Sequence, residues 1–133
     1  MILGGAGNDR IAGGLGADNM SGGDGHDIFV LEMPDVSFDR ISGFDSLFDT
    51  LEVSRSEFGF DIGDDQGVPG WFIANSSGLA SDGGNETTRF IYSRGLLYFD
   101  ADGTGAADAI ALSVIATIPG SGPLSASDFL VVA

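Results

Sequence analysis

The large apolar residues near the start of the chain recur every nine positions. Three units of nine residues follow one another without a gap between residues 4 and 30, and the eighth position of each unit is Ile11, Met20 or Phe29. Successive side chains of a strand point to opposite faces. The last three residues of each unit therefore predict a very short strand whose eighth-position side chain points inward.

Glycine and aspartate occupy the other fixed positions of these units. The units read GGAGNDRIA, GGLGADNMS and GGDGHDIFV, with Gly at positions 1, 2 and 4 and Asp at position 6. Glycine allows positive φ and leaves backbone carbonyls uncovered, so the pattern predicts a tight turn with converging oxygens. Turns alternating with short strands make a flattened coil. An ordinary solvated loop explains one such unit, but not three in register.

Two units per circuit would place the first and third turns at one corner, about 4.8 Å apart. Asp9 and Asp27 would then face each other, and two such carboxylates repel by about 1 kcal/mol in water and by more in a drier corner. Calcium binds about six to eight oxygens from carboxylates and carbonyls, and it tolerates irregular geometry better than magnesium. The chain has one His and no Cys, so it offers few ligands to metals that prefer nitrogen or sulfur.

The composition describes an acidic chain that can nevertheless fold. It has 20 Asp and Glu residues against 5 Arg and no Lys, giving a formal net charge of −15 over 133 residues. This charge argues against nucleic acid and anionic membranes as partners. Hydrophobic residues make up 43% of the chain, which argues against disorder. No apolar run is long enough for a membrane span, and we expect a chain that folds when cations offset its charge.

The three nonapeptides resemble the repeat-in-toxin (RTX, hemolysin-type) calcium-binding repeat. The resemblance implies a right-handed parallel β-roll with calcium held between stacked turns. For the first and third turns it implies carbonyl or carboxylate ligands from Gly5, Gly7, Asp9, Gly22, Asp24 and Asp27. For the second turn it implies Gly14, Gly16 and Asp18, completed by downstream residues. Glu32, Asp35 and Asp39 are available there, and the resemblance favours Glu32 and Asp39.

The rest of the chain predicts more strands. Apolar runs at 38–44, 49–53, 70–74 and 109–115 are strand candidates, and 89–92 with 96–99 predict a hairpin around Gly95. Ser125 or Ser127 is expected to cap a single turn before a last strand at 129–132. The predicted fold is all-β, with a parallel β-roll of three nonapeptides (1–37) continuing into a C-terminal, β-sandwich-like capping domain (38–133).

Other acidic turns offer weaker cation candidates. Asp45 and Asp49 are either solvated turn residues or additional ligands. Asp100, Asp102 and Asp108 fall at the first, third and ninth positions of a loop that resembles the start of an EF-hand. Ala111 occupies the twelfth position, where an EF-hand has its bidentate Glu. We therefore interpret this loop as a tight Asp/Gly turn, with a weak ion site as the alternative.

The sequence contains no recognisable catalytic set. His26 is the only His and occupies a variable turn position, where an exposed side chain is expected. The residues needed for zinc-dependent hydrolysis and for His-assisted nucleophilic attack are therefore missing from the sequence. Neither a phosphate-binding loop nor a GxSxG nucleophile elbow is present. Acid/base catalysis by a pair of carboxylates, as in glycosidases, is the remaining enzymatic alternative. However, the aspartates that recur in register in the repeats are the ones that the metal needs as ligands. Trp71 is interpreted as a core residue, with ligand stacking as the alternative.

The resemblance also carries a functional hypothesis. RTX tails of type I secreted bacterial proteins end in an export signal, and here Asp128 followed by residues 129–132 resembles it. We therefore expect a calcium-binding, non-enzymatic module at the end of a longer protein, whose cargo domain precedes this chain. It would pass through a type I (ABC) exporter and fold on calcium outside the cell or at its surface. The alternative is a calcium-dependent module of an adhesin, S-layer protein or polysaccharide-modifying enzyme that recognises carbohydrate or protein.

Overall fold

The computed structural model describes residues 1–32, 38–54, 56, 72–74, 90–93, 95–99, 110–118, 120 and 124–132. Nearly all regular structure in these residues is β-strand. The strands are β1 (Ile2–Ala6), β2 (Arg10–Ala12), β3 (Asn19–Asp24), β4 (Ile28–Val30), β5 (Asp39–Phe44), β6 (Thr50–Ser54), β7 (Phe72–Ala74), β8 (Phe90–Ser93), β9 (Leu96–Phe99), β10 (Ile110–Thr117) and β11 (Phe129–Val132). One short 3-10 helix, η1 (Ala126–Asp128), precedes β11.

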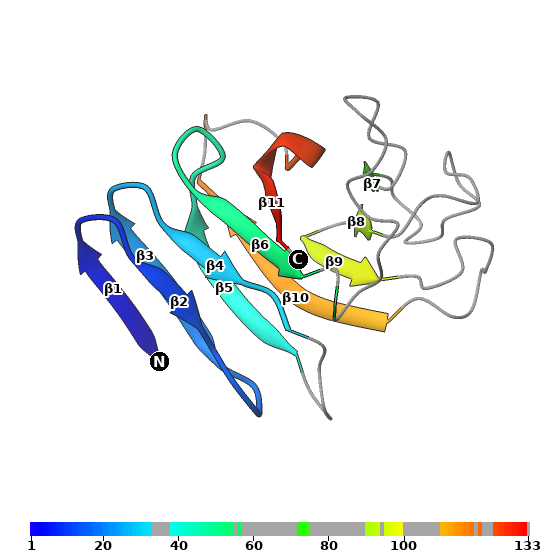
Figure 1. The fold of residues 1–133 in the computed structure, drawn as a ribbon, viewed down its shortest axis with the longest axis horizontal. Helices are drawn as coiled ribbons and strands as arrows, with labels where there is room; N and C mark the ends of the chain where they lie inside the picture. The colour runs from blue at the N-terminus through cyan, green and yellow to red at the C-terminus, as the bar shows by residue number, and fades with distance from the viewer. Residues whose placement is uncertain are drawn as a thin grey trace.

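The strands form two sheets that share the repeats between them (Figure 1). The larger sheet has the order β1-β3-β5-β10-β9-β8-β7, and the smaller has the order β11-β6-β4-β2. Along the repeats, the chain alternates between the sheets, and β1-β3-β5 and β2-β4-β6 are all paired in parallel. The predicted all-β fold with a parallel β-roll is therefore confirmed.

The coil continues for two strands beyond the nonapeptides. In the smaller sheet, Arg10 pairs with Ile28 and Ile28 with Thr50, so a circuit of 18 residues is followed by one of 22. In the larger sheet, Ile2 pairs with Met20 and Met20 with Ile41, giving circuits of 18 and 21 residues. Strands β5 and β6 are therefore further turns of the same roll, although their sequences lack the glycine pattern.

The eighth-position side chains lie in the core, as the nine-residue period predicts. Ile11 is 5% exposed, Met20 1% and Phe29 0%. They belong to one hydrophobic cluster with side chains from both sheets and from the C-terminal half, including Phe90 and Ile115. Burying one such side chain contributes about 1.5–3 kcal/mol, so the stacking of the coils is fixed mainly by this core.

The C-terminal half continues both sheets. Strands β8 and β9 form the predicted antiparallel hairpin, and Gly95 in its connection has a φ of 83°. Strand β10 pairs with β9 on one side and, in parallel, with β5 on the other. Strand β11 pairs in parallel with β6. The predicted boundary at residues 37/38 adjoins residues that the structure does not describe, and it stays a prediction.

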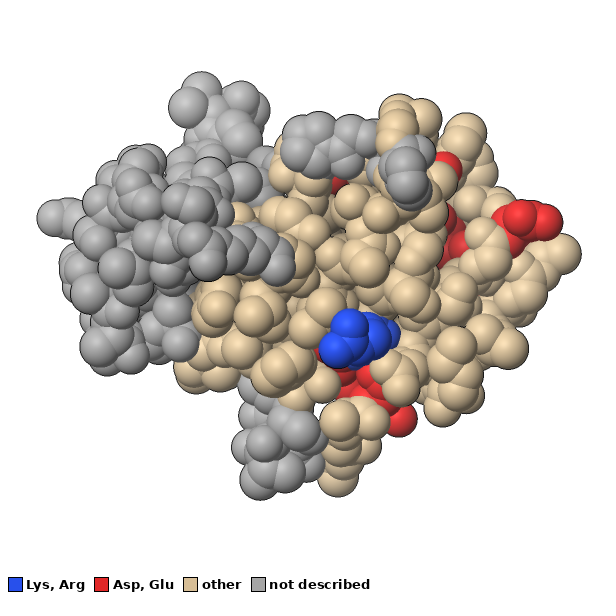
Figure 2. Space-filling view, turned by 180° about the vertical axis from the view of Figure 1, so that it is seen from behind, with Lys and Arg blue, Asp and Glu red and all other residues tan. Residues whose placement is uncertain are grey.

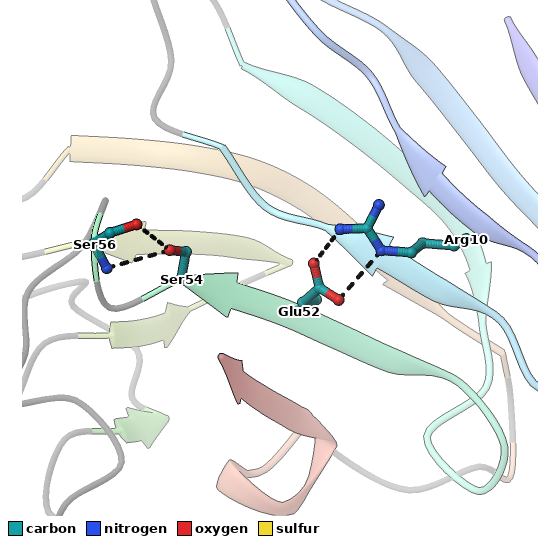
Figure 3. Close-up of polar contacts among 4 residues, drawn as sticks. All are labelled: Arg10, Glu52, Ser54 and Ser56. Carbon is teal, nitrogen blue, oxygen red and sulfur yellow. Dashed lines mark hydrogen bonds and ion pairs between the residues drawn. The ribbon is translucent and has the colours of Figure 1, made fainter. Parts of the chain in front are cut away.

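An ion pair spans three strands on the outside of the smaller sheet (Figure 3). Arg10 on β2 reaches across β4 to Glu52 on β6, with Nη2 2.6 Å from Oε2 and Nε 3.3 Å from Oε1. Glu52 is buried while Arg10 is exposed, and the carboxylate raises the pKa of the Arg10 guanidinium. On the same strand as Glu52, the Ser54 hydroxyl accepts a 3.2 Å bond from Ser56 N. The ion pair thus connects the first repeat directly to a strand beyond the repeats.

The face of the molecule shown in Figure 2 carries few charged groups among its described residues. Acidic side chains lie toward the right side and below the middle of this face, where they adjoin a basic patch near its centre. Among the described residues, no helix has the length and apolar character needed to cross a membrane.

Several sequence predictions lie outside the described residues. These are the predicted ligand candidates Asp35, Asp100, Asp102 and Asp108, together with Trp71.

The turn before the last strand holds a buried carboxylate. The Asp128 side chain is 4% exposed, and its Oδ2 accepts a 2.8 Å bond from Ser125 N, while Asp128 N donates to Ser125 O. The single turn before the last strand is present as predicted, and these two bonds join Asp128 to the main chain of Ser125. Burial raises the pKa of Asp128 above its ordinary 3.8, although the bonds from Ser125 oppose the shift.

This raised pKa predicts a pH-dependent effect of Asp128→Asn. A raised folded-state pKa means that the folded protein holds the proton more tightly, so this group destabilises the fold as pH rises through that window. Asn can still accept from Ser125 N but carries no charge. With saturating calcium, we expect D128N to melt a few degrees above wild type at pH 7, and the advantage to shrink toward pH 4. A difference that stays constant across thermal melts in this pH range would contradict the prediction.

Candidate metal centre

Five aspartates line the two edges of the roll where the strands turn from one sheet to the other. Asp9, Asp27 and Asp49 make up what we call the first corner, and Asp18 and Asp39 the second. Within the first corner, Asp9 N donates to Asp27 Oδ1 at 2.9 Å and Asp27 N to Asp49 Oδ1 at 3.1 Å. In the second corner, Asp18 N donates to Asp39 Oδ1 at 2.9 Å. Each corner is therefore a ladder of stacked carboxylates.

One oxygen of each repeat aspartate has no hydrogen-bond partner among the described residues. The Oδ2 atoms of Asp9, Asp18 and Asp27 are buried, and no described group forms a hydrogen bond with them. Leaving a buried acceptor unsatisfied costs about 1–3 kcal/mol, and more when the group is charged. The repeats thus hold three carboxylate oxygens that need a positively charged partner.

The first glycine of each unit makes room for these oxygens. A methyl group on Gly4 would lie 2.6 Å from Gly22 O and 2.8 Å from Asp9 Oδ2, and one on Gly22 would collide with the Asp27 carboxylate. Neither residue is among the glycines with positive φ. The expectation that the first glycine serves a positive φ was therefore wrong, because this position requires space beside the aspartate.

The second and fourth glycines of each unit do take positive φ. The values are 95° and 104° at Gly5 and Gly7, and 80° and 93° at Gly14 and Gly16, a region that only glycine enters at low cost. Gly5 pairs with Gly23 of the third turn, and Gly7 N donates to Asp24 O at 2.8 Å. The predicted oxygen ligands of the first and third turns are thus brought to one corner.

The second corner gathers the residues predicted for the second turn. A methyl group on Gly13 would lie 2.7 Å from Asp39 Oδ2 and 3.2 Å from Asp18 Oδ2, so two carboxylate oxygens border one small space. Glu32 Oε2 accepts a bond from Gly14 N at 2.9 Å, which places this third carboxylate at the same turn. Glu32 and Asp39 therefore both lie against the turn that they were expected to complete.

Asp49, which the sequence left as either a solvated turn residue or an additional ligand, is a buried member of the first corner. It is 6% exposed, and its Oδ2 accepts from Asp45 N at 2.9 Å. Burial raises its pKa; the N–H groups of Asp45 and Asp27 oppose this rise and their carboxylates add to it. The signal in the sequence was an Asp two positions before a buried apolar residue, since Asp49 precedes Leu51 as Asp27 precedes Phe29.

His26 lies outside the carboxylate ladder. Its side chain is exposed, with Nδ1 3.1 Å from Phe48 O and the ring edge-on to Phe48 at 5.1 Å. The prediction of an exposed turn residue is confirmed.

The donor chemistry of the corners fits a hard cation that binds oxygen. Side chains alone do not complete a site, because the described residues contain no group of three or more acidic or His side chains arranged for a metal. Main-chain carbonyls must therefore supply some of the metal ligands, and calcium commonly binds such carbonyls. The unpartnered carboxylate oxygens and the uncovered glycine turns offer both kinds of ligand.

Comparison with known families agrees with this chemistry. The model of the RTX calcium-binding nonapeptide repeat (4 copies) matches residues 1–29. Repeats of this family bind calcium. No curated protein and no solved structure is similar enough to the chain to count as a match.

The space beside Gly13 predicts a selective loss of calcium binding. Gly13→Ala would push a methyl group between the Asp18 and Asp39 carboxylates, so we expect calcium affinity at the second corner to fall about tenfold or more in calorimetric titrations. Gly43→Ala is the matched control, since Gly43 also lies in the roll, has a φ of 69° and has nothing within 4 Å of the added methyl. It should cost about 1–2 kcal/mol of stability without reducing the number of ions bound. Wild-type binding by G13A would contradict this account.

Proposed function

Because residues 1–29 are RTX calcium-binding nonapeptide repeats, we propose that this chain is the calcium-folded, C-terminal module of a longer exported protein. The observation that carries the proposal is the set of three buried aspartate oxygens that form no hydrogen bond within the described part of the chain. A chain with these oxygens is destabilised without cations and stabilised with them. Calcium outside the cell then determines when the module folds.

In this proposal, one ion lies at each corner. The ion of the first corner is held by oxygens of Gly5, Gly7, Asp9, Gly22, Asp24 and Asp27. The ion of the second corner is held by Gly14, Gly16, Asp18, Glu32 and Asp39. When bound, calcium supplies positive charge and no reactive chemistry, so the module acts by binding and folding and not by catalysis.

Calcium stabilises the folded state through linkage. A ligand that binds only the folded chain adds RT ln(1 + [L]/Kd), so a site tenfold tighter than the ambient calcium concentration adds about 1.4 kcal/mol. Two sites add their contributions, and the shared core couples them. We propose that the roll (1–37) and the capping domain (38–133) respond together, since both sheets run through both parts.

The export role rests on the end of the chain. Asp128 and the apolar strand β11 resemble the type I export signal, and in the folded module Asp128 is buried while β11 is paired with β6. We propose that the signal is read while the chain is unfolded in the cell, where calcium is scarce. The exporter would deliver the chain and its upstream cargo to the outside or to the cell surface, where calcium folds the module.

A second candidate function is calcium-dependent recognition of carbohydrate or protein. The observation that favours it is a pair of apolar side chains at the tip of the turn before β6: Leu47 is 68% exposed and Phe48 50%. They lie on the turn between Asp45 and Asp49, beside the first corner. A partner seated here would bind only when that corner is ordered.

The proposal predicts that folding requires calcium. In excess chelator, far-UV circular dichroism should show a largely disordered chain, and addition of about 1 mM calcium should convert it to a β-rich spectrum. Magnesium at the same concentration serves as the control and should restore much less structure, because it requires nearly ideal octahedral geometry. An identical β-rich spectrum in chelator and in calcium would overturn the proposal.

The export role predicts secretion of a fused reporter. A reporter placed before residues 1–133 should reach the medium from cells with a type I exporter, and removal of residues 128–133 should abolish its export. The matched control is D128N within the intact tail, which separates loss of the acidic residue from loss of the strand. Export that continues without residues 128–133 would refute the signal. Binding of the calcium-loaded module to a glycan array would support the recognition function.

A further inference from the structure

Asn8 occupies the fifth position of the first repeat, and its side chain bonds to the third repeat. Its Oδ1 accepts a 2.8 Å hydrogen bond from His26 N, at the same position of the repeat 18 residues later. A methyl group on Gly25 would lie 3.0 Å from this Oδ1, so the asparagine side chain lies close against the third turn. The residue type at the fifth position varies between the repeats, yet here it joins two successive layers of the coil.

The fifth position of the third repeat makes a similar contact with the turn that follows. His26 Nδ1 lies 3.1 Å from Phe48 O. Because a carbonyl can only accept, Nδ1 carries the proton and donates this bond. The two contacts form what we call the outer ladder, which runs from Asn8 to His26 to Phe48 beside the carboxylates of the first corner. The second repeat has Ala17 at the fifth position, and its methyl group can form no such bond.

The bond to Asn8 fixes a peptide unit in the most flexible part of the third turn. Gly25, which precedes His26, has a φ of 130°, and glycine loses more conformational freedom on folding than any other residue. A peptide unit is planar, so holding the His26 N–H also fixes the direction of the Gly25 carbonyl. The Asn8 side chain therefore orders the backbone that leads to Asp27.

Asn8 shares the task of joining the first and third turns with two bonds that involve predicted ligands. Gly7 N donates to Asp24 O at 2.8 Å, and Asp9 N donates to Asp27 Oδ1 at 2.9 Å. The side chain of Asn8 is neutral and lies outside the predicted ligand set. It therefore holds the two layers together without adding to the negative charge that the ion must offset.

We propose that Asn8 is a positioning residue that holds the first corner closed around its calcium ion. It fixes, against the first turn, the segment of the third turn that carries Asp24 and Asp27. The inference rests on the proposed ligand roles of Asp9, Asp24 and Asp27. Without the Asn8 acceptor, the first corner should lose its ion more readily, while the second corner should be unaffected.

Amide hydrogen exchange of the calcium-loaded full chain tests this role. Asp9 N and Asp18 N make matched 2.9 Å bonds to a carboxylate of the next turn, so their N–H groups report the first and second corners respectively. At calcium concentrations that keep the chain folded, loss of an ion opens its corner locally, so protection of each N–H should rise with calcium. In Asn8→Ala we expect Asp9 N–H to need about tenfold more calcium to reach its wild-type protection, within the range that outer-shell partners cost. The Asp18 N–H should keep its wild-type protection.

Two control variants separate the hydrogen bond from other effects of the substitution. Asn8→Asp keeps an acceptor oxygen at the same place, so the Asp9 N–H should retain its wild-type protection. Asn19→Ala removes another exposed asparagine of the repeats, which lies on β3, and should change neither N–H.

The possible outcomes separate this inference from the proposed function. Equal losses of protection at Asp9 and Asp18 in N8A would mean that Asn8 acts through overall stability. Unchanged protection in N8A, or the same loss in N8D or N19A, would mean that the Asn8 acceptor does not hold the corner. Each of these results would overturn the inference and leave the proposed function intact. If protection of both N–H groups in the wild-type chain did not depend on calcium, the proposed ligand roles would fail, and this inference with them.

Discussion

The structure depends on how buried carboxylates are compensated at the edges of the roll. Each repeat aspartate points into the space that a glycine of its own turn leaves free, and no donor from the residues that the structure describes reaches one of its two oxygens. The hydrophobic core fixes the coils at the spacing of paired strands, so the carboxylates cannot separate to relieve their repulsion. Stable stacking of the strands therefore requires a bound cation. The core that stacks the strands also brings the carboxylates together, and without the ion their repulsion is not offset.

The sequence predicted the repeat coil well because its signals are local. The eighth-position residues were assigned to the core, two units per circuit placed Asp9 beside Asp27, and the hairpin followed from its turn. The continuation of the coil into β5 and β6 was less visible, since only an Asp two residues before Ile41 or Leu51 survives from the repeat pattern. The role of the first glycine was also misjudged, because a requirement for space depends on a neighbour that only the fold reveals.

Contacts between distant segments could not be predicted from one sequence. The pairing of β10 with β5 brings Ser113 to Asp39, which is 74 residues away along the chain, and the bond from Arg10 to Glu52 spans 42 residues. The contact of Arg10 with Glu52 links the first repeat to a strand beyond the repeats, and the contact of Ser113 with Asp39 links the coil to the C-terminal half. Together with the single core cluster, they join the roll and the C-terminal half into one unit that should gain or lose its structure cooperatively.

The two-sheet winding of the coil also restricts how such a module can change in length. One nonapeptide carries the chain from one sheet to the other. The insertion of a single unit would therefore move every preceding strand to the opposite sheet and every preceding aspartate to the opposite corner. Arg10 would then sit in the opposite sheet from Glu52. Insertions or deletions of two units keep every remaining strand in its own sheet and every remaining aspartate at its own corner, and evolution or design should therefore adjust this roll in steps of 18 residues.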